Sequence, residues 1–342
     1  MRVAALLIFS SLFAVMATAQ AAPAPQYSLQ HEYVLGGDGG WDYLTYDAEG
    51  HRLFISRGDR IQVVDTGTGK LITEIPGMDG VHGAALVPEL GKGFTSNGRS
   101  NSVTVFDFKT LKVTNTIKLS GEGPDGFVYE PVTKRVFFFN GHSKNVSVVD
   151  AVTEKEIAVI PLDGRPEFPV ADGKGMVYVN IESKSELSEI DAAKAVVTKT
   201  WSLAPCESPS GLAMDQQHRR LFSGCDNKLM AVSDPDAGKV VATFPIGDGV
   251  DATRFDPGTQ LAFSSNGEGT LTVAHEDSPD KYTVLQNAPT RKFARTMTLD
   301  PVSHQVYLVT AQVEVGPAPA PGQRPKRTVL PGTFKVLVMG QQ

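Results

Sequence analysis

One pattern of apolar and polar positions recurs along the chain. A short run rich in β-branched and aromatic residues ends five times in an acidic residue and a sixth time in a histidine. These run ends lie 41 to 43 residues apart, at Asp65, Asp107, Asp150, Asp191, Asp234 and His275. Internal repetition at such a fixed spacing indicates a repeat architecture in which every unit has the same fold.

Each unit contains the same sequence of predicted strands and turns. In the third unit the strands are Gly126–Glu130, Val136–Asn140, a run ending at Asp150, and Glu156–Ile160. Short strands separated by turn residues are what antiparallel hairpins require, and no long helical periodicity is present. Four strands in about 40 to 45 residues predict an all-β propeller with four-stranded antiparallel blades. The alternative is a pair of β-sandwiches.

A seventh unit is interrupted and is completed from the other end of the chain. Its third strand, Phe334–Val338, follows His275 by 63 residues, and Gly316–Pro331 supplies a Pro-rich insertion that we expect to be an exposed loop. The chain ends after this strand, whereas Tyr27–Gly37 resembles a fourth strand. We therefore predict one seven-bladed domain over residues 22–342, closed by the N-terminal strand so that no edge stays open.

The first 21 residues have the features of a secretory signal. Arg2 precedes the apolar stretch Val3–Met16, and Ala19-Gln20-Ala21 is a small-x-small cleavage site. We expect a periplasmic or secreted protein without a membrane span after cleavage; the alternative is a membrane anchor. The net charge of −6 and the pI of about 5.7 argue against nucleic acid as the main partner.

The chain has two cysteines, Cys206 and Cys225. In an oxidising compartment an even number of cysteines favours one disulfide, and two free thiols are the alternative. Antiparallel pairing would bring the two residues to the same end of a hairpin. Two thiols are too few for a structural metal site of their own.

Parts of the repeat resemble a known family. The run from Val136 to Asp150 and the run Met176–Asn180 resemble the YVTN repeat, and Ile160–Pro166 is similar to the linker of that family. The chain therefore resembles the YncE-like family of exported β-propellers. This resemblance implies the propeller fold, and it implies little about function, because some members are proposed to bind nucleic acid or metals. The first, fifth and sixth units depart from the repeat.

Alignment of the first strands puts one residue of each unit at the mouth of the central channel. These residues are Asp42, His82, Asp125, Glu167, Ser210, Asp251 and Arg295, at steps of 40 to 44 residues. Crowded carboxylates repel one another, so they raise one another's pKa or attract a cation. Carboxylate oxygens suit Ca²⁺ or Mg²⁺, and a histidine adds Zn²⁺. The candidate metal ligands are His82, Asp125, Glu167 and Asp251; alternatively, the ring consists of solvated loop ends.

Further polar residues belong to the same predicted face. Asn97, Asn140, Asn180 and Asn266 end the second strands, where Cys225 stands in the fifth unit, and Arg57, Arg99 and His142 lie nearby. Asparagine also forms turns, so these amides have a structural alternative. Trp41 either stacks on a ligand or packs internally. The candidate ligand-binding residues are Trp41, Asp42, Arg57, Asn97, Asn140, His142, Asn180, Ser210, Asn266, Arg291 and Arg295.

Two functions of different classes follow from these features. The first is a binding module, expected to be monomeric, that takes a small molecule or a protein at the channel mouth. The second is a metal-dependent, lactonase-like hydrolase with one divalent cation (Ca²⁺, Mg²⁺ or Zn²⁺), in which Glu167 or Asp125 is the general base. The fold alone cannot choose, since propellers host many functions.

Overall fold

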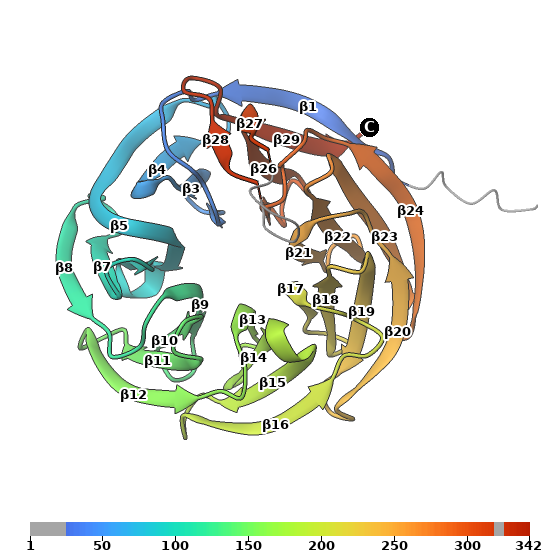
Figure 1. Ribbon diagram of the computed structural model, residues 1–342, viewed down its shortest axis with the longest axis horizontal. Coiled ribbons are helices and arrows are strands. Elements are labelled where there is room, and N and C mark those ends of the chain that lie inside the picture. The colour runs from blue at the N-terminus through green and yellow to red at the C-terminus, as the bar shows by residue number, and fades with distance from the viewer. Residues whose placement is uncertain (1–24, 318–324) are drawn as a thin grey trace, which may run out of the picture.

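The computed structural model describes residues 25–317 and 325–342. The predicted signal segment, residues 1–21, lies outside the described residues. Antiparallel β-sheets follow one another around a ring, with the first strand of each unit facing a central channel and the fourth strand outermost (Figure 1). Within the described ranges the helical elements are two short 3₁₀ turns, η1 (Pro88–Leu90) and η2 (Glu182–Lys184). Neither is long enough to cross a membrane.

Four of the sheets are formed by four consecutive strands. The first contains β9 (Pro124–Glu130), β10 (Arg135–Asn140), β11 (Asn145–Asp150) and β12 (Lys155–Pro161). The second contains β13 (Pro166–Ala171), β14 (Met176–Ile181), β15 (Glu186–Asp191) and β16 (Val196–Ser202). The third contains β17 (Pro209–Asp215), β18 (Arg220–Cys225), β19 (Leu229–Asp234) and β20 (Lys239–Pro245). The fourth contains β21 (Val250–Asp256), β22 (Leu261–Asn266), β23 (Thr270–Ser278) and β24 (Lys281–Pro289).

The first two units form one seven-stranded sheet because they share a strand. Its strands are β2 (Leu44–Asp47), β3 (Arg52–Ser56), β4 (Gly58–Asp65), β5 (Leu71–Val87), β6 (Lys92–Asn97), β7 (Ser102–Asp107) and β8 (Val113–Lys118). The 17-residue β5 pairs with β4 through its first half, where Ile75 faces Ile61. Its second half pairs with β6, where Ala85 faces Phe94.

The remaining four-stranded sheet joins both ends of the chain. It contains β25 (Met297–Leu299), β26 (Val306–Thr310), β29 (Lys335–Gln341) and β1 (Tyr27–Val34). β1 pairs antiparallel with β29 from Tyr27 opposite Gln341 to Val34 opposite Lys335. The ring of Tyr27 is 1% exposed, and its hydroxyl donates a hydrogen bond to the carbonyl of His304 at 2.9 Å. The N-terminal strand is therefore a packed part of the last unit, as its sequence suggested.

The insertion in the last unit begins and ends in paired strands. β27 (Val313–Val315) and β28 (Arg327–Val329) form an antiparallel hairpin on either side of residues 318–324, which lie outside the described residues. A loop without strands was expected over residues 316–331, so the structure differs at the C-terminal end of that segment. Backbone pairing, as of Val315 with Arg327, explains why residues 327–329 form a strand and not a loop.

The core lies between neighbouring sheets around the ring. Within β10, Phe138 belongs to an apolar cluster with Phe94 of the preceding sheet. Its neighbours in sequence, Phe137 and Phe139, belong to a cluster with Val177 of the following sheet. Successive side chains of a strand point to opposite faces, and here both faces are covered. An uninterrupted apolar run is therefore required at this position.

The repeated acidic residue has a structural role in a turn. The carboxylate of Asp150 accepts hydrogen bonds from the backbone N–H groups of Val152 and Thr153, at 3.0 and 2.7 Å. Asp107 is bonded in the same way by the N–H group of Thr110. Aspartate favours such turns because its short side chain reaches the backbone two and three residues on. The periodic acidic positions thus mark the turn between third and fourth strands.

The predicted disulfide between Cys206 and Cys225 is confirmed. Cys206 lies just before β17 and Cys225 ends β18, with their Cα atoms 5.5 Å apart. Both residues are buried. The bond therefore joins the start of an innermost strand to the end of its hairpin partner.

Candidate functional site

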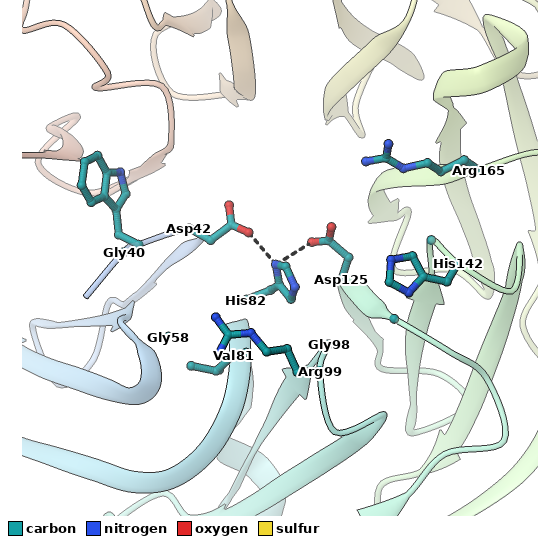
Figure 2. Close-up of a pocket in the computed structure, with 14 residues that line it drawn as sticks. Gly40, Asp42, Gly58, Val81, His82, Gly98, Arg99, Asp125, His142 and Arg165 are labelled. Atoms are coloured by element: carbon teal, nitrogen blue, oxygen red, sulfur yellow. Dashed lines mark hydrogen bonds and ion pairs between the residues drawn. The ribbon is translucent and has the colours of Figure 1, made fainter. Parts of the chain in front are cut away.

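The aligned acidic and polar positions lie at one end of the innermost strands. His82 is in β5, Asp125 at the start of β9 and Glu167 at the start of β13, while Asp42 immediately precedes Tyr43 and β2. Figure 2 shows Asp42 and Asp125 directed toward the imidazole of His82 from either side. The innermost strands of successive units all start at this end of the ring. They therefore bring Asp42, His82 and Asp125 together, although these residues are 40 and 43 positions apart in sequence.

His82 is the centre of a three-residue cluster. Its Nδ1 lies 2.7 Å from Oδ2 of Asp42 and 3.2 Å from Oδ1 of Asp125. Burial opposes a charged imidazole, but the hydrogen bond with Asp42 and the charges of Asp125, Asp42 and Glu167 outweigh it and raise the pKa of His82 to about 9. At neutral pH the ring is therefore a cation between two carboxylates.

The other mouth residues form two further groups. Nη1 of Arg295 lies 2.8 Å from Oδ2 of Asp251, and the hydroxyl of Ser210 donates to Oδ1 of Asp251 at 3.2 Å. Nη2 of Arg165 lies 2.6 Å from Oε1 of Glu167. The structure thus divides the ring into Asp42–His82–Asp125, Ser210–Asp251–Arg295 and the pair of Glu167 with Arg165.

Three of the mouth carboxylates hold their protons unusually tightly. Burial is the largest cause and raises the pKa of Asp125 to about 6, that of Glu167 to about 8 and that of Asp251 to about 7. Neighbouring carboxylates add to these shifts, whereas His82 opposes the shift of Asp125 and Arg295 that of Asp251. For Glu167 the shift occurs despite the contact with Arg165, whose side chain is 50% exposed and therefore screened by water. The mouth has more carboxylates than its own cations neutralise.

Aromatic side chains form the floor of the mouth and explain the burial. Tyr43 follows Asp42, and its buried ring packs among other aromatic side chains. Its ring centroid lies 4.4 Å from that of Phe168 and 5.4 Å from that of Phe127. A second cavity, of about 400 Å³, lies on the far side of these rings and includes Arg254. The carboxylates above the rings are therefore backed by apolar groups instead of water.

A cavity of about 510 Å³ opens above the cluster. Arg99, His142 and Arg165 line its wall (Figure 2). Trp41 also belongs to the lining. The Trp41 ring also packs against Phe334, with centroids 5.6 Å apart, so the residue packs internally; stacking on a ligand stays a prediction. A cavity of this size admits a side chain or a small molecule.

Glycine is required where this cavity approaches two histidine rings. A Cβ atom at Gly98 would lie 2.7 Å from Nε2 of His82. A Cβ atom at Gly123 would lie 2.8 Å from the ring of His142, and Gly123 has a φ of +67°. Small residues at these two positions leave space for the imidazoles beside the mouth.

The predicted asparagine ring lies beneath the cavity instead of lining it. The four amides are fully buried, and each side chain hydrogen-bonds to protein groups. Nδ2 of Asn140 donates to Ser147 at 3.0 Å, and Nδ2 of Asn180 donates to the carbonyl of Ser210 at 3.0 Å. Asn97 donates to Thr104 and Asn266 to Thr272, both at 2.9 Å. These contacts are structural, but they run to other strands and not to the turn backbone that the alternative named; a ligand contact for the amides stays a prediction.

Arg57 and Arg291 also make contacts within the protein. The buried guanidinium of Arg57 stacks over Phe334 at 3.7 Å and donates to the carbonyl of Asp38 at 2.6 Å and to Gln62 at 2.9 Å. Arg291 pairs with Glu32 of β1 at 2.9 Å and does not line the mouth cavity. Neither is brought to the His82 cluster.

Sequence reasoning overlooked Arg165 and Tyr43. Arg165 lies two residues before Glu167 in the linker, where a guanidinium beside a predicted mouth carboxylate is a recognisable signal. Tyr43 follows Asp42 directly before β2, and no sequence signal identified it.

Only part of the predicted metal-ligand set is brought together. Among the described residues, the ligand atoms of Asp42, His82 and Asp125 all lie within 4.8 Å of one another. One imidazole and two carboxylates suit Zn²⁺ or a similar cation. Glu167 and Asp251 do not join this group, because Arg165 and Arg295 engage them.

Comparisons with known proteins show the fold. No family model matches the chain, and no curated protein matches it. A crystal structure of the WD40 repeats of RRP9 has a TM-score of 0.78 at 10% sequence identity, covering 93% of this chain and all of that chain. A structure of U3-55K has a TM-score of 0.74 at 10% identity, covering 92% of this chain and 99% of that chain. The chain is therefore similar in fold to WD40 β-propellers, and it is a β-propeller.

Proposed function

We propose that this chain is a binding module whose acidic channel mouth takes a basic side chain of a protein partner. The observation that carries the proposal is the excess of carboxylates: among the described residues, four stand at the mouth against three cationic side chains that contact them. The carboxylates are Asp42, Asp125, Glu167 and Asp251, and the cations are His82, Arg165 and Arg295. An ammonium or guanidinium group entering the cavity would supply the missing positive charge. Trp41 at the wall offers an aromatic face to the same group.

The proposal includes the finer architecture and the location. We infer seven blades, because the shared strand β5 lets the seven-stranded sheet count as two blades beside the five four-stranded sheets. The pairing of β1 with β29 supports a ring closed by the N-terminal strand. Membership of the YncE-like family and export to the periplasm or the medium rest on the sequence patterns alone. The fold likeness to WD40 structures supports a protein as the partner.

A peptide titration tests the binding function. The chain has two tryptophans; Trp201 is buried, so fluorescence changes on adding a ligand to the mouth should come from Trp41. The probes are blocked pentapeptides, acetyl-Gly-Gly-Arg-Gly-Gly-amide and its glutamate counterpart. We expect saturable binding of the arginine peptide, weakened about tenfold or more by Asp125→Asn or Glu167→Gln, and no binding of the glutamate peptide.

The matched control is Asp163→Asn, which removes the same charge from a side chain that is 86% exposed four residues before Glu167. It should leave the affinity unchanged. Trp41→Phe should abolish the fluorescence change without abolishing binding of the peptide. Equal affinity for both peptides, or an equal loss with Asp163→Asn, would refute the proposal.

A second candidate is the metal-dependent hydrolase, which the close approach of Asp42, His82 and Asp125 favours. In this function a divalent cation would polarise a carbonyl, and Glu167 would act as the general base. The test adds Ca²⁺, Mg²⁺ or Zn²⁺ and follows hydrolysis of γ- and δ-lactones. Activity that requires metal and disappears with His82→Gln supports it; a wild type that binds none of the three cations at the mouth overturns it.

A further inference from the structure

A second cluster of a histidine and two carboxylates lies on the face opposite the channel mouth. β17 begins at the mouth beside Ser210 and ends at Asp215 on the other side. His218 lies in the turn that follows, and Glu276 comes from β23 of the next sheet. The cluster therefore bridges two neighbouring blades and is separate from the site at His82.

The three ligand atoms converge on one point. Nδ1 of His218 lies 2.7 Å from Oδ2 of Asp215 and 2.9 Å from Oε1 of Glu276. All three atoms lie within 4.8 Å of one another. Two ligands that are each about 2.1 Å from one cation, at right angles, lie about 3 Å apart. These separations match that arrangement.

Hydrogen bonding within the protein leaves two members of the cluster, Glu276 and Nδ1 of His218, unsatisfied. Glu276 is 2% exposed, and neither of its carboxylate oxygens has a hydrogen-bond partner among the described residues. Nδ1 of His218 also lacks a well-formed hydrogen bond, although it lies close to one oxygen of each carboxylate. A buried carboxylate without partners is costly, and each such group in a folded protein calls for an explanation such as an ion.

The charge of the cluster calls for a cation. Two carboxylates and a neutral imidazole carry a formal charge of −2, which one divalent cation neutralises. The positive charge of Arg220 acts on Glu276. Nε of Arg220, however, donates to the carboxylate of Asp280 at 2.9 Å and to the carbonyl of Pro279 at 3.0 Å. It does not take the position between the three ligand atoms.

The next blade supplies an internal comparison. Asp256 ends β21 as Asp215 ends β17, and Nδ1 of His304 lies 2.7 Å from its Oδ2. There the contact is a well-formed hydrogen bond, and no third ligand joins the pair among the described residues. The pair of His304 with Asp256 shows what an ordinary histidine–aspartate contact looks like at this position of the fold.

From this geometry we infer that Asp215, His218 and Glu276 form a binding site for one divalent transition-metal cation of the Zn²⁺ or Mn²⁺ class. Nδ1 of His218 and one oxygen of each carboxylate are the protein ligands, and water completes the coordination. An imidazole nitrogen in the set favours these cations over Ca²⁺, which prefers oxygen ligands alone. The cation links β17 to β23 and so stabilises the contact between two blades.

The test uses the full mature protein after treatment with a chelator. ZnCl₂ or MnCl₂ is added, with CaCl₂ as the comparison, and bound metal and Tm are measured. We expect one equivalent bound at this cluster and a Tm rise of about 2 °C or more once free metal exceeds the Kd about tenfold. His218→Gln and Glu276→Gln should abolish both effects, whereas His304→Gln and His82→Gln should leave them intact.

A second measurement needs no variant. In the wild-type protein diamagnetic Zn²⁺ should shift the ring NMR signals of His218 while those of His304 stay in place. The inference is overturned if metal leaves the His218 signals and Tm unchanged, or if His218→Gln and Glu276→Gln retain the bound equivalent. Loss of binding with His82→Gln alone would assign the metal to the channel mouth instead.

Discussion

A Cβ atom at Gly98 would lie 2.7 Å from Nε2 of His82, so the absence of a side chain at position 98 lets the imidazole stand between two carboxylates. The other ring nitrogen, Nδ1, faces Asp42 and Asp125. The two contacts hold the ring from opposite sides. One glycine of the channel mouth therefore controls the electrostatics of the cluster.

Gly98→Ala should displace the imidazole of His82 and lower its pKa from about 9. The reason is that movement away from Asp42 and Asp125 removes the charges that hold the proton. An NMR titration of the ring resonances measures the pKa. Gly141→Ala is the control, because a Cβ atom there meets its nearest neighbour at an ordinary 3.7 Å. An unchanged pKa in Gly98→Ala would show that the ring does not depend on this space.

Glu167→Gln should stabilise the protein at alkaline pH. Folding raises the pKa of Glu167 from 4.5 to about 8, so the folded state holds a proton that the unfolded state releases. Wild-type stability is therefore lost as pH rises from about 4.5 to about 8, and glutamine has no proton to release. We expect the variant to be more stable by about 4 kcal/mol at pH 8 and equal to wild type near pH 4.

Urea denaturation at pH 4, 6 and 8 measures this difference. A variant less stable than wild type at pH 8 would contradict the prediction and show that the ion pair with Arg165 outweighs the burial of the carboxylate.

Removal of the disulfide should lower stability by about 3 kcal/mol, since a cross-link over a short loop limits the unfolded chain. Cys206 and Cys225 are 19 residues apart. The variant replaces both cysteines with alanine, and its unfolding is compared with that of wild type with and without dithiothreitol. Reductant should destabilise wild type by a similar amount and leave the variant unaffected. Two alkylatable thiols in the native protein would contradict the bond.

Deletion of residues 1–34 should expose the edge of β29. The deletion removes seven strand pairs and the buried ring of Tyr27. An open apolar edge favours pairing between molecules, so we expect association in analytical ultracentrifugation and a strongly lowered Tm. Deletion of residues 1–25 leaves β1 intact and is the control. A monomeric, stable protein after the longer deletion would show that β1 is dispensable.

Arg57→Lys should destabilise the protein by about 2 kcal/mol, because an ammonium cannot replace a planar guanidinium that bonds carbonyls at several angles. The wild-type group stacks over Phe334 and donates to the carbonyls of Gly36, Asp38, Gly39 and Gly40. Arg99→Lys, at a side chain that is 75% exposed, should change stability by less than about 0.5 kcal/mol. Urea denaturation compares the two; equal effects would refute a structural role for Arg57.

The strand repeat could be predicted because it depends on local rules. The runs that end at Asp107 and Asp150 alternate side chains between two covered faces, and their acidic residues bond to the backbone of the following turn. The fixed spacing then put Asp42, His82 and Asp125 at equivalent positions of successive units, without information on the distances between their side chains. The cysteine pair followed from the same alignment.

The subdivision of the mouth could not be predicted in this way. Whether a carboxylate meets His82, Arg165 or Arg295 depends on rotamers and on loop paths that bring distant residues within about 3 Å of one another. The burial of the asparagines beneath the cavity likewise depends on the depth of each strand end in the ring.

By itself the sequence predicted the strand repeat, a disulfide between Cys206 and Cys225 and the alignment of Asp42, His82 and Asp125, because each depends on periodicity or on neighbours along the chain. Only the tertiary structure decided which charges meet, and it alone brought Glu276 to Asp215 and His218 from the neighbouring blade. The physical reason is that an ion pair or a metal site requires its atoms to lie within about 3 to 4 Å of one another. Sequence spacing specifies neither the rotamers nor the loop paths that set such distances.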